Sequence, residues 1–193
     1  MEKPRISIRR VCVFCGSKSG NDPAIVETTR ALAEELARTG RTLVYGGGSV
    51  GLMGVLADAM LAAGGEVVGV LPRGLFAAEV AHEGLSELRE VGSMHERKVV
   101  MAKLSDGFVA LPGGFGTLDE LFEMITLTQL GVHHKPVALL DVGDYFSGTL
   151  AQVERAVATG FIRPDHARLL DRATGVRELL ERMERRIAKH GAS

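Results

Sequence analysis

Two observations on this sequence predict a doubly wound α/β fold, with a mostly parallel sheet and helices on both faces. Short aliphatic runs alternate about five times with longer amphipathic runs, which is typical of parallel strands joined by helices. The aliphatic runs lack polar alternation, so each strand should be covered on both faces. The 193 residues fit a domain of about 100–200 residues. We therefore expect a single Rossmann-like domain over residues 1–193, with 1–9 as a flexible N-terminal segment.

The aliphatic runs give the expected strands, and the amphipathic runs give the expected helices. Strands are expected over 10–15, 42–45, 66–71, 107–111 and 136–140, and helices over about 23–38, 50–63, 94–104, 117–130 and 145–159, before a C-terminal amphipathic helix. The first helix has a clear start, because Asp22 is a good N-cap ahead of a proline at the first helical position. The segment 73–91 interrupts the alternation, and we expect a loop-rich insertion there.

Composition excludes several classes of protein. Lys and Arg number 23 against 24 Asp and Glu, a net charge of −1, so the chain lacks the broad basic field of a nucleic-acid-binding protein. Aromatic residues make up 5% and Trp is absent, which argues against a base-stacking platform. No apolar run approaches the roughly 18 residues of a membrane span, and the run at 11–15 is too short for a signal peptide. We expect a cytoplasmic protein without a membrane partner.

The cysteines and histidines do not form a recognisable metal or redox site. Cys12 and Cys15 lie in a predicted buried strand, where a spacing of three points the thiols to opposite faces. A redox CxxC motif instead opens a helix, so we interpret both as reduced core residues. His95, His133 and His134 lack a ligand pattern, and we predict no metal.

Three predicted strands run directly into glycine-rich turns. The turns are 15–18 (CGSK), 46–54 (GGGSVGLMG) and 112–117 (PGGFGT). All three should lie at the carboxyl edge of one sheet, where open α/β sheets bind ligands. Glycines let the backbone approach a ligand, and a helix N-terminus attracts phosphate. We therefore predict nucleotide binding at this edge, with Gly16, Ser17, Gly47 and Gly48 as secondary candidate residues.

A dinucleotide-binding dehydrogenase is an alternative, because Gly46, Gly48 and Gly51 satisfy GxGxxG. That fingerprint normally follows the first strand, and an acidic residue about 20 positions on ends the next strand. Here the next strand ends in the sequence VLPR, which argues against NAD or FAD. A Walker phosphate loop is also absent from the sequence.

The segments 112–120 (PGGFGTLDE) and 94–98 (MHERK) are the most specific in the chain. With them the chain resembles the Lonely Guy family of cytokinin-activating phosphoribohydrolases, whose PGGxGTxxE signature and Arg-Lys pair are both matched. The resemblance extends over nearly the whole chain. Phe115 stands where the family usually has Tyr, and Asp119 where it usually has Glu, which bears on substrate preference more than on reaction type.

The resemblance implies hydrolysis of the N-glycosidic bond of adenosine 5′-monophosphates, N6-modified or plain, to free base and ribose 5-phosphate. It implies no cofactor, and a homodimer with the site near the interface. Arg97 and Glu120 would be catalytic. The substrate-binding residues would be Glu79, Arg97, Lys98, Gly113, Gly114, Phe115, Gly116, Thr117, Leu118 and Asp119, with Met94 and Glu123 as secondary candidates.

The chemistry of the residues agrees with this reading. Cleavage of a base from ribose builds positive charge on the sugar, so a carboxylate beside C1′ is needed, and Glu120 is the candidate. It can stabilise that charge, orient or deprotonate the attacking water, or do both. Arg97 is a poor proton donor, because a guanidinium group stays protonated in proteins, and would hold Glu120, phosphate or the departing purine. Lys98 would add positive charge for the nucleotide.

Structural alternatives remain open for these residues. Thr117 and Glu120 fit a capping box, in which Glu120 would only reach back to the helix start. Arg97 and Lys98 could form a solvated helix face. Members of the family are often labelled lysine decarboxylases, but the sequence has no local signature of the Schiff-base lysine that a pyridoxal enzyme needs. A non-catalytic nucleotide or molybdopterin carrier, or a nucleotide sensor, would keep the glycine turns without a reactive Glu120.

Overall fold

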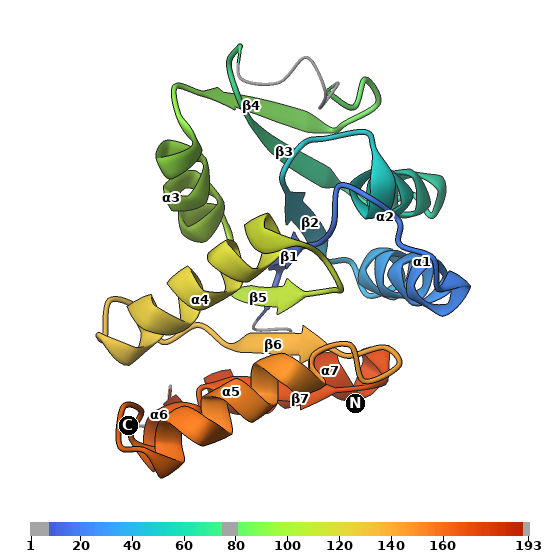
Figure 1. Ribbon diagram of the computed structural model, residues 1–193. Helices are drawn as coiled ribbons and strands as arrows, with labels where there is room; N and C mark the ends of the chain where they lie inside the picture. Colours follow the sequence, from blue (N-terminus) through green and yellow to red (C-terminus); the bar gives the residue numbers. More distant parts are fainter. Residues whose placement is uncertain (1–7, 75–80, 191–193) are drawn as a thin grey trace, which may run out of the picture.

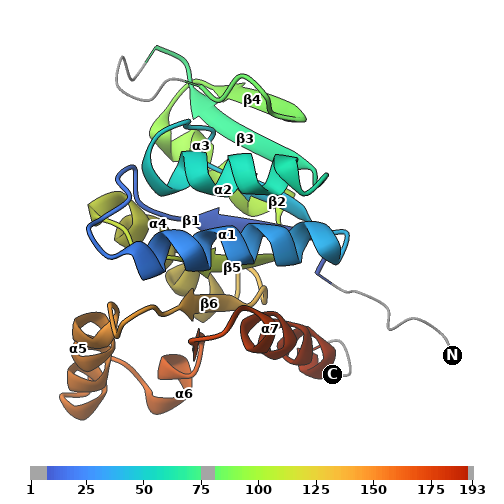
Figure 2. The same ribbon diagram turned by 90° about the vertical axis from the view of Figure 1, so that its right-hand side faces the viewer.

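The computed structural model describes residues 8–74 and 81–190, which form a seven-stranded sheet in the order β4-β3-β2-β1-β5-β6-β7. Every strand pairs parallel to its neighbours. The strands are β1 (Arg10–Phe14), β2 (Thr42–Tyr45), β3 (Val67–Pro72), β4 (Glu87–Val91), β5 (Gly107–Ala110), β6 (Val137–Leu140) and β7 (Leu170–Ala173). The helices are α1 (Pro23–Arg38), α2 (Gly51–Ala62), α3 (Met94–Leu104), α4 (Phe115–Gln129), α5 (Ser147–Ala158), α6 (Pro164–Ala167) and α7 (Val176–His190). The predicted fold class is confirmed (Figures 1 and 2).

Two apolar cores lie on opposite faces of this sheet. On one face, side chains of α1, α2 and α7 pack on the strands, and on the other, side chains of α3, α4 and α5 do so. Cys15 belongs to the first core and Cys12 to the second. Both thiols are free and buried, so the interpretation as reduced core residues facing opposite ways is confirmed.

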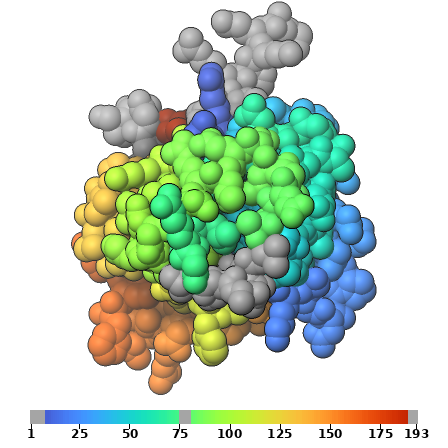
Figure 3. Space-filling view, turned by 90° about the horizontal axis from the view of Figure 1, so that it is seen from above, coloured from blue at the N-terminus to red at the C-terminus, as the bar shows by residue number. Residues whose placement is uncertain are grey.

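The two edge strands, β4 and β7, were not predicted from the sequence. β4 lies within the segment 73–91, so the expectation of a loop-rich insertion is wrong for 87–91. Four of its five residues are exposed, and Figure 3 looks onto this edge, where the green region of β4 and α3 forms much of the surface. β7, at the other edge, has a single buried residue. Edge strands can be polar because one side faces solvent, so neither strand has the aliphatic run that marks the central ones.

The order of the strands reverses between β1 and β5. The chain builds β2, β3 and β4 on one side of β1 and then crosses over to β5, β6 and β7 on the other. In doubly wound sheets the ligand crevice opens at this switch point, outside the carboxyl ends of the strands. The turns after β1 and β5 meet there, since Gly16 N donates to the carbonyl of Pro112 at 3.1 Å. The turn after β2 meets them as well, because Leu52 N donates to the carbonyl of Gly16 at 3.0 Å. The topology thus brings together all three predicted glycine turns.

The start of the described chain is held to the domain. Ile8 is fully buried, and its N–H donates to Glu184 at 3.3 Å. The N–H of Arg9 donates to Asp106 at 2.9 Å. The expectation of a flexible segment over 1–9 is therefore wrong for Ile8 and Arg9, while 1–7 lie outside the described residues.

Candidate active site

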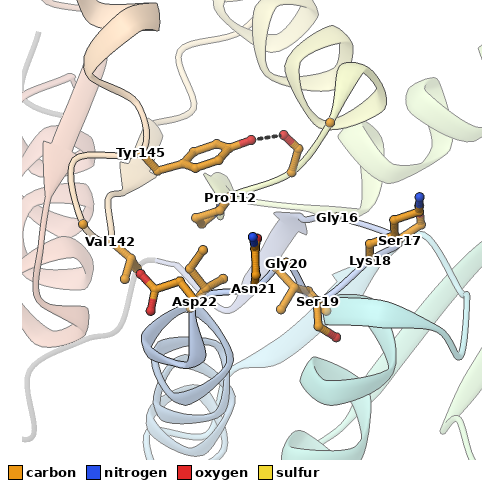
Figure 4. A pocket seen from close by; sticks show the side chains of 15 residues that line it. Gly16, Ser17, Lys18, Ser19, Gly20, Asn21, Asp22, Pro112, Val142 and Tyr145 are labelled. Carbon is orange, nitrogen blue, oxygen red and sulfur yellow. Dashed lines mark hydrogen bonds between the residues drawn. The ribbon is translucent and has the colours of Figure 1, made fainter.

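Two adjoining cavities open at the carboxyl edge of the sheet and share Gly16, Ser17 and Gly114. The larger, of about 530 Å³, lies between the turn after β1 and the turn after β6 (Figure 4). The smaller, of about 220 Å³, lies between the end of β1 and the first turns of α3 and α4. The smaller cavity contains both residues that the sequence nominates as catalytic, Arg97 and Glu120.

Arg97 enters the smaller cavity from a well-capped helix. Ser93 caps α3 by accepting from the N–H of Glu96 at 3.1 Å, and the Glu96 carboxylate accepts from Gly92 N at 2.7 Å. These two bonds hold the first turn of α3, from which Arg97 points inward. Arg97 is only 5% exposed, and its Nη2 donates to the carbonyl of Gly46 at 2.9 Å. The alternative of a solvated helix face is therefore wrong for Arg97.

The glycine turn after β2 makes room for this guanidinium. A Cβ at Gly46 would lie 1.9 Å from Nη2 of Arg97, so no other residue fits without displacing Arg97. Gly47 and Gly48 are buried and line neither cavity. Their carbonyls accept from the N–H of His82 and the hydroxyl of Tyr45. This turn supports Arg97, and the structure does not bring Gly47 or Gly48 into the site.

Glu120 lies in the second turn of α4 and lines the smaller cavity. The N-cap of α4 is Gly114, and Thr117 is already the third helical residue, 3% exposed. A capping box led by Thr117 needs Thr117 at the N-cap, so that alternative is wrong. The helix begins at Phe115, two residues before the predicted start.

The charges of Arg97 and Glu120 both reach the buried thiols of β1. Burial raises the pKa of the Cys15 thiol, the Glu120 carboxylate raises it further, and the Arg97 guanidinium opposes them. Burial and Glu120 also raise the pKa of Cys12. Since the reactive form of cysteine is the thiolate, Cys15 is not a nucleophile here although it lines the cavity. Of the two carboxylates that line this cavity, Asp119 lies 2.9 Å from Nζ of Lys98, so Glu120 is the stronger candidate to face a developing positive charge.

The N-terminus of α4 has the features of an anion-binding turn. Gly114, Phe115 and Gly116 are exposed, and the first turn carries no acidic residue. The first N–H groups of a helix have no partner within the helix and lie at its positive end. Gly113 is required behind them, because a Cβ there would lie 2.1 Å from Oγ1 of Thr117. This turn borders both cavities through Gly114.

Lys98 does not lie in either cavity, where it was predicted to add positive charge for the nucleotide. Its Nζ lies 2.9 Å from Asp119 and 2.6 Å from Glu123, and it lines neither cavity. Burial lowers the pKa of Lys98, but the bonds to Glu123 and Asp119 outweigh burial and raise it. Lys98 therefore connects α3 to α4 through Asp119 and Glu123.

The remaining nominated residues divide into three groups. Met94, Phe115, Gly116, Thr117 and Asp119 line the smaller cavity. Leu118 packs against an apolar core and, like Glu123, lines neither cavity. Glu79 lies outside the described residues.

Residues of two turns around the larger cavity were missed. Ser19, Asn21 and Asp22 follow β1, and Tyr145 follows β6. The Tyr145 hydroxyl donates to the carbonyl of Gly113 at 2.5 Å (Figure 4). The rule that ligand residues follow parallel strands would have found Tyr145, because it comes five residues after the predicted end of its strand at 140.

Within 8–74 and 81–190, no three His, Cys, Asp or Glu side chains gather as they would around a metal ion. His95 and His134 are exposed. None of the helices in the described part of the chain combines the length and apolar character needed to cross a membrane.

Comparisons with known proteins give a consistent result. A family described as "Possible lysine decarboxylase" matches residues 53–183. A probable cytokinin riboside 5′-monophosphate phosphoribohydrolase of Oryza sativa subsp. japonica is 52% identical over 176 residues, covering 91% of this chain and 78% of that protein. A cytokinin riboside 5′-monophosphate phosphoribohydrolase of Arabidopsis thaliana is 45% identical over 184 residues, covering 95% and 85%.

A solved structure shares the fold at lower identity. The molybdenum cofactor carrier protein of Chlamydomonas reinhardtii has a TM-score of 0.69 and 21% identity, with 93% of this chain and 98% of that chain covered. At this identity the likeness extends to the fold alone.

Proposed function

This chain belongs to the Lonely Guy family of cytokinin riboside 5′-monophosphate phosphoribohydrolases, and on that premise we propose that it hydrolyses adenosine 5′-monophosphates, plain or N6-modified. The reaction breaks the bond between C1′ of the ribose and the base. Water supplies the hydroxyl group at C1′, and the other proton of that water ends on the base. The products are the free base and ribose 5-phosphate.

The placement of Arg97 and Glu120 in one cavity beside the N-terminus of α4 is the observation that carries this proposal. The 5′-phosphate binds the N–H groups of Gly114, Phe115 and Gly116, where the helix dipole favours an anion. The ribose then lies toward Glu120, one helical turn further along α4.

Glu120 acts as the ionised carboxylate beside C1′. As the glycosidic bond breaks, its electron pair leaves with the base and positive charge develops on the sugar, as in other glycoside cleavage. A fixed carboxylate stabilises that charge and orients the attacking water. Arg97 stays protonated throughout, so it donates hydrogen bonds to the nucleotide and supplies no proton.

The positions of the lysines argue against a decarboxylase. A pyridoxal enzyme needs a lysine free to form a Schiff base. Lys98 is held between Asp119 and Glu123, and no lysine is among the described residues that line the smaller cavity. Lys18 lines the larger cavity, outside the one that contains Arg97 and Glu120. A molybdopterin carrier is the alternative that the fold allows, but carriage does not require a carboxylate and a guanidinium together beside the anion site.

We infer further that the protein works as a cytoplasmic homodimer without nucleic acid or membrane partners. Phe115 is 94% exposed and Phe122 41%, and their spacing of seven puts them on one face of α4. Such a face fits a subunit contact next to the site. Glu79 would contact substrate from the segment that the structure does not describe.

The test of this function is incubation with AMP and with N6-isopentenyl-AMP, with released base and ribose 5-phosphate both measured. Adenosine is the control. A charge-assisted hydrogen bond is worth about 1.5–3 kcal/mol, so we expect kcat/KM for the monophosphates to exceed that for adenosine by about 10- to 150-fold. Binding of either nucleotide without turnover would support the carrier, and equal turnover of adenosine and AMP would exclude phosphate recognition at α4.

A further inference from the structure

We propose that Tyr145 is a positioning residue of the phosphate-binding turn: its hydroxyl holds the peptide between Gly113 and Gly114 in the orientation that anion binding needs. The inference rests on the proposed function, because it concerns the site assigned there to the 5′-phosphate. It adds the turn after β6 to a site that the signature segments place on α3 and α4 alone.

The contact joins the two sides of the larger cavity. Tyr145 reaches across from the turn after β6, and its hydroxyl donates to the Gly113 carbonyl at 2.5 Å (Figure 4). This distance is at the short end for an O–H···O bond. The ring is 47% exposed, so packing into a core does not explain its position.

Fixing the Gly113 carbonyl also fixes the N–H of Gly114. The peptide bond is planar and trans, so its C=O and N–H point in opposite directions. The carbonyl points to Tyr145, and the Gly114 N–H is directed away from Tyr145. A flip of this peptide would exchange the two groups and turn the negative end of a carbonyl toward the anion.

Local sequence cannot choose between these two orientations. Glycine adopts most backbone conformations at little cost, so a peptide between two glycines rotates more easily than others. Gly114 has nothing within 4 Å of the position that a Cβ would take, so no neighbouring group packs on that side of it. A hydrogen bond from outside the turn is therefore an effective restraint.

The flanking carbonyls are already engaged. The carbonyl of Pro112 accepts from Gly16 N at 3.1 Å, and the carbonyl of Gly114 accepts from Leu118 N at 3.1 Å. Because the Tyr145 hydroxyl donates to the carbonyl of Gly113, three consecutive carbonyls in this turn accept a hydrogen bond. Each of these dipoles is thereby prevented from turning toward a bound phosphate.

The turn after β6 is rigid enough to hold Tyr145 in place. Phe146 is fully buried, and its ring meets that of Tyr145 edge-on at 5.1 Å. The Asp141 carboxylate is 1% exposed; it accepts from Phe146 N at 3.1 Å and from Nε of Arg172 at 2.7 Å. Arg172 also donates to Asp144 at 2.5 Å. These bonds connect the turn to β7.

The experiment replaces Tyr145 by Phe, which removes the hydroxyl and keeps the ring. Thr126→Val is the matched control, because it removes an exposed hydroxyl that donates to a backbone carbonyl, that of Phe122 at 2.7 Å, further along α4. For both variants and the wild type we would measure kcat and KM for AMP, inhibition by ribose 5-phosphate and by adenine, and thermal unfolding.

A net hydrogen bond of about 0.5–1.5 kcal/mol corresponds to a two- to twelvefold change. We expect Tyr145→Phe to raise KM for AMP and the inhibition constant of ribose 5-phosphate by about that factor. Inhibition by adenine, which lacks phosphate, should be unchanged, as should the unfolding temperature. Thr126→Val should resemble the wild type in every measurement.

Three results would overturn the assignment: unchanged ribose 5-phosphate affinity in Tyr145→Phe, an equal loss for adenine and ribose 5-phosphate, or the same loss in Thr126→Val. Calorimetric titration of each protein with ribose 5-phosphate separates this proposal from the function itself. If the wild type releases no base from AMP or N6-isopentenyl-AMP, the proposed function fails, and the titration still decides the role of Tyr145. A wild type that does not bind ribose 5-phosphate would overturn the role as well.

Discussion

The two cavities at the carboxyl edge of the sheet are lined by different kinds of secondary structure. In the smaller cavity both candidate catalytic side chains come from helices, with Arg97 on α3 buried and bonded to Gly46, and Glu120 on α4. The larger cavity is lined mainly by turns, namely 16–22 after β1, 112–114 after β5, and Val142, Gly143 and Tyr145 after β6. Side chains on helices are held more accurately than those on loops. Bond cleavage needs that accuracy at the reacting atom, whereas a phosphate can be bound by backbone N–H groups that hydrogen bonds hold in place.

This difference predicts that substitutions of Arg97 and Glu120 in the smaller cavity lower kcat, and that substitutions in the larger cavity that release the Gly113–Gly114 peptide raise KM. The sharpest test is Glu120→Gln, which removes the charge and keeps the size. Loss of a carboxylate needed only in the transition state should lower kcat by about 10²–10⁴, with KM changing much less. Steady-state kinetics with AMP would measure this effect.

The control for Glu120→Gln is Glu154→Gln, an exposed position on α5. It should leave kcat unchanged, and neither variant should lower the unfolding temperature, because α4 is not capped by Glu120. A Glu120→Gln protein with normal kcat would contradict the mechanism.

A smaller loss of activity is expected for Arg97→Lys. The charge remains, but an ammonium group cannot reproduce the planar fork that donates to Gly46 while facing the cavity. We expect kcat/KM to fall by about 10- to 100-fold. If Arg97 and Glu120 act as one unit, the double variant should lose less than the sum of the two single losses, and strictly additive losses would show that they act independently.

Gly46→Ala tests whether the turn after β2 acts through Arg97. The added Cβ would lie 1.9 Å from Nη2, so the guanidinium must move, and we expect about a tenfold loss of kcat/KM together with about 1–3 kcal/mol of unfolding free energy, as for other overpacked sites. Kinetics and urea unfolding on the same preparations measure both.

Gly148→Ala on α5 is the matched control for Gly46→Ala, since a Cβ at Gly148 would have no neighbour within 4 Å. It should keep full activity and the same or a slightly higher stability. Equal activity of the two alanine variants would show that Arg97 tolerates displacement.

The smallest effect on activity is expected for Lys98→Met. Because Lys98 lines neither cavity and pairs with Asp119 and Glu123, KM for AMP should change less than twofold, while the unfolding free energy falls by about 1 kcal/mol. The folded pKa of Lys98 is raised, so this stabilisation is present below the pKa of the unfolded chain and is lost as pH rises through the folded value.

Lys103→Met, at an exposed position in the last turn of α3, is the control and should cost less stability at neutral pH. A large rise in KM for Lys98→Met would instead restore the predicted role in nucleotide binding and blur the distinction between the two cavities.

The sequence by itself determined the central part of this protein. β1, β2, β3, β5 and β6 are buried on both faces, so each needed an aliphatic run that could be read directly. α1 and α3 have the predicted bounds because their start signals are local: Asp22 accepts from Ala24 N, and Ser93 from Glu96 N. The signature segments named Arg97 and Glu120 through a family resemblance.

Only the tertiary structure decided what depends on neighbours distant in sequence. β4 and β7 became strands through pairing at the sheet edges, where solvent removes the need for an apolar run. Lys98 was directed to Asp119 and Glu123 by the packing of α3 beside α4. Tyr145 reached Gly113 because β6 lies beside β5. A residue's type states which bonds it can form, and the fold alone determines which partner is close enough to form them.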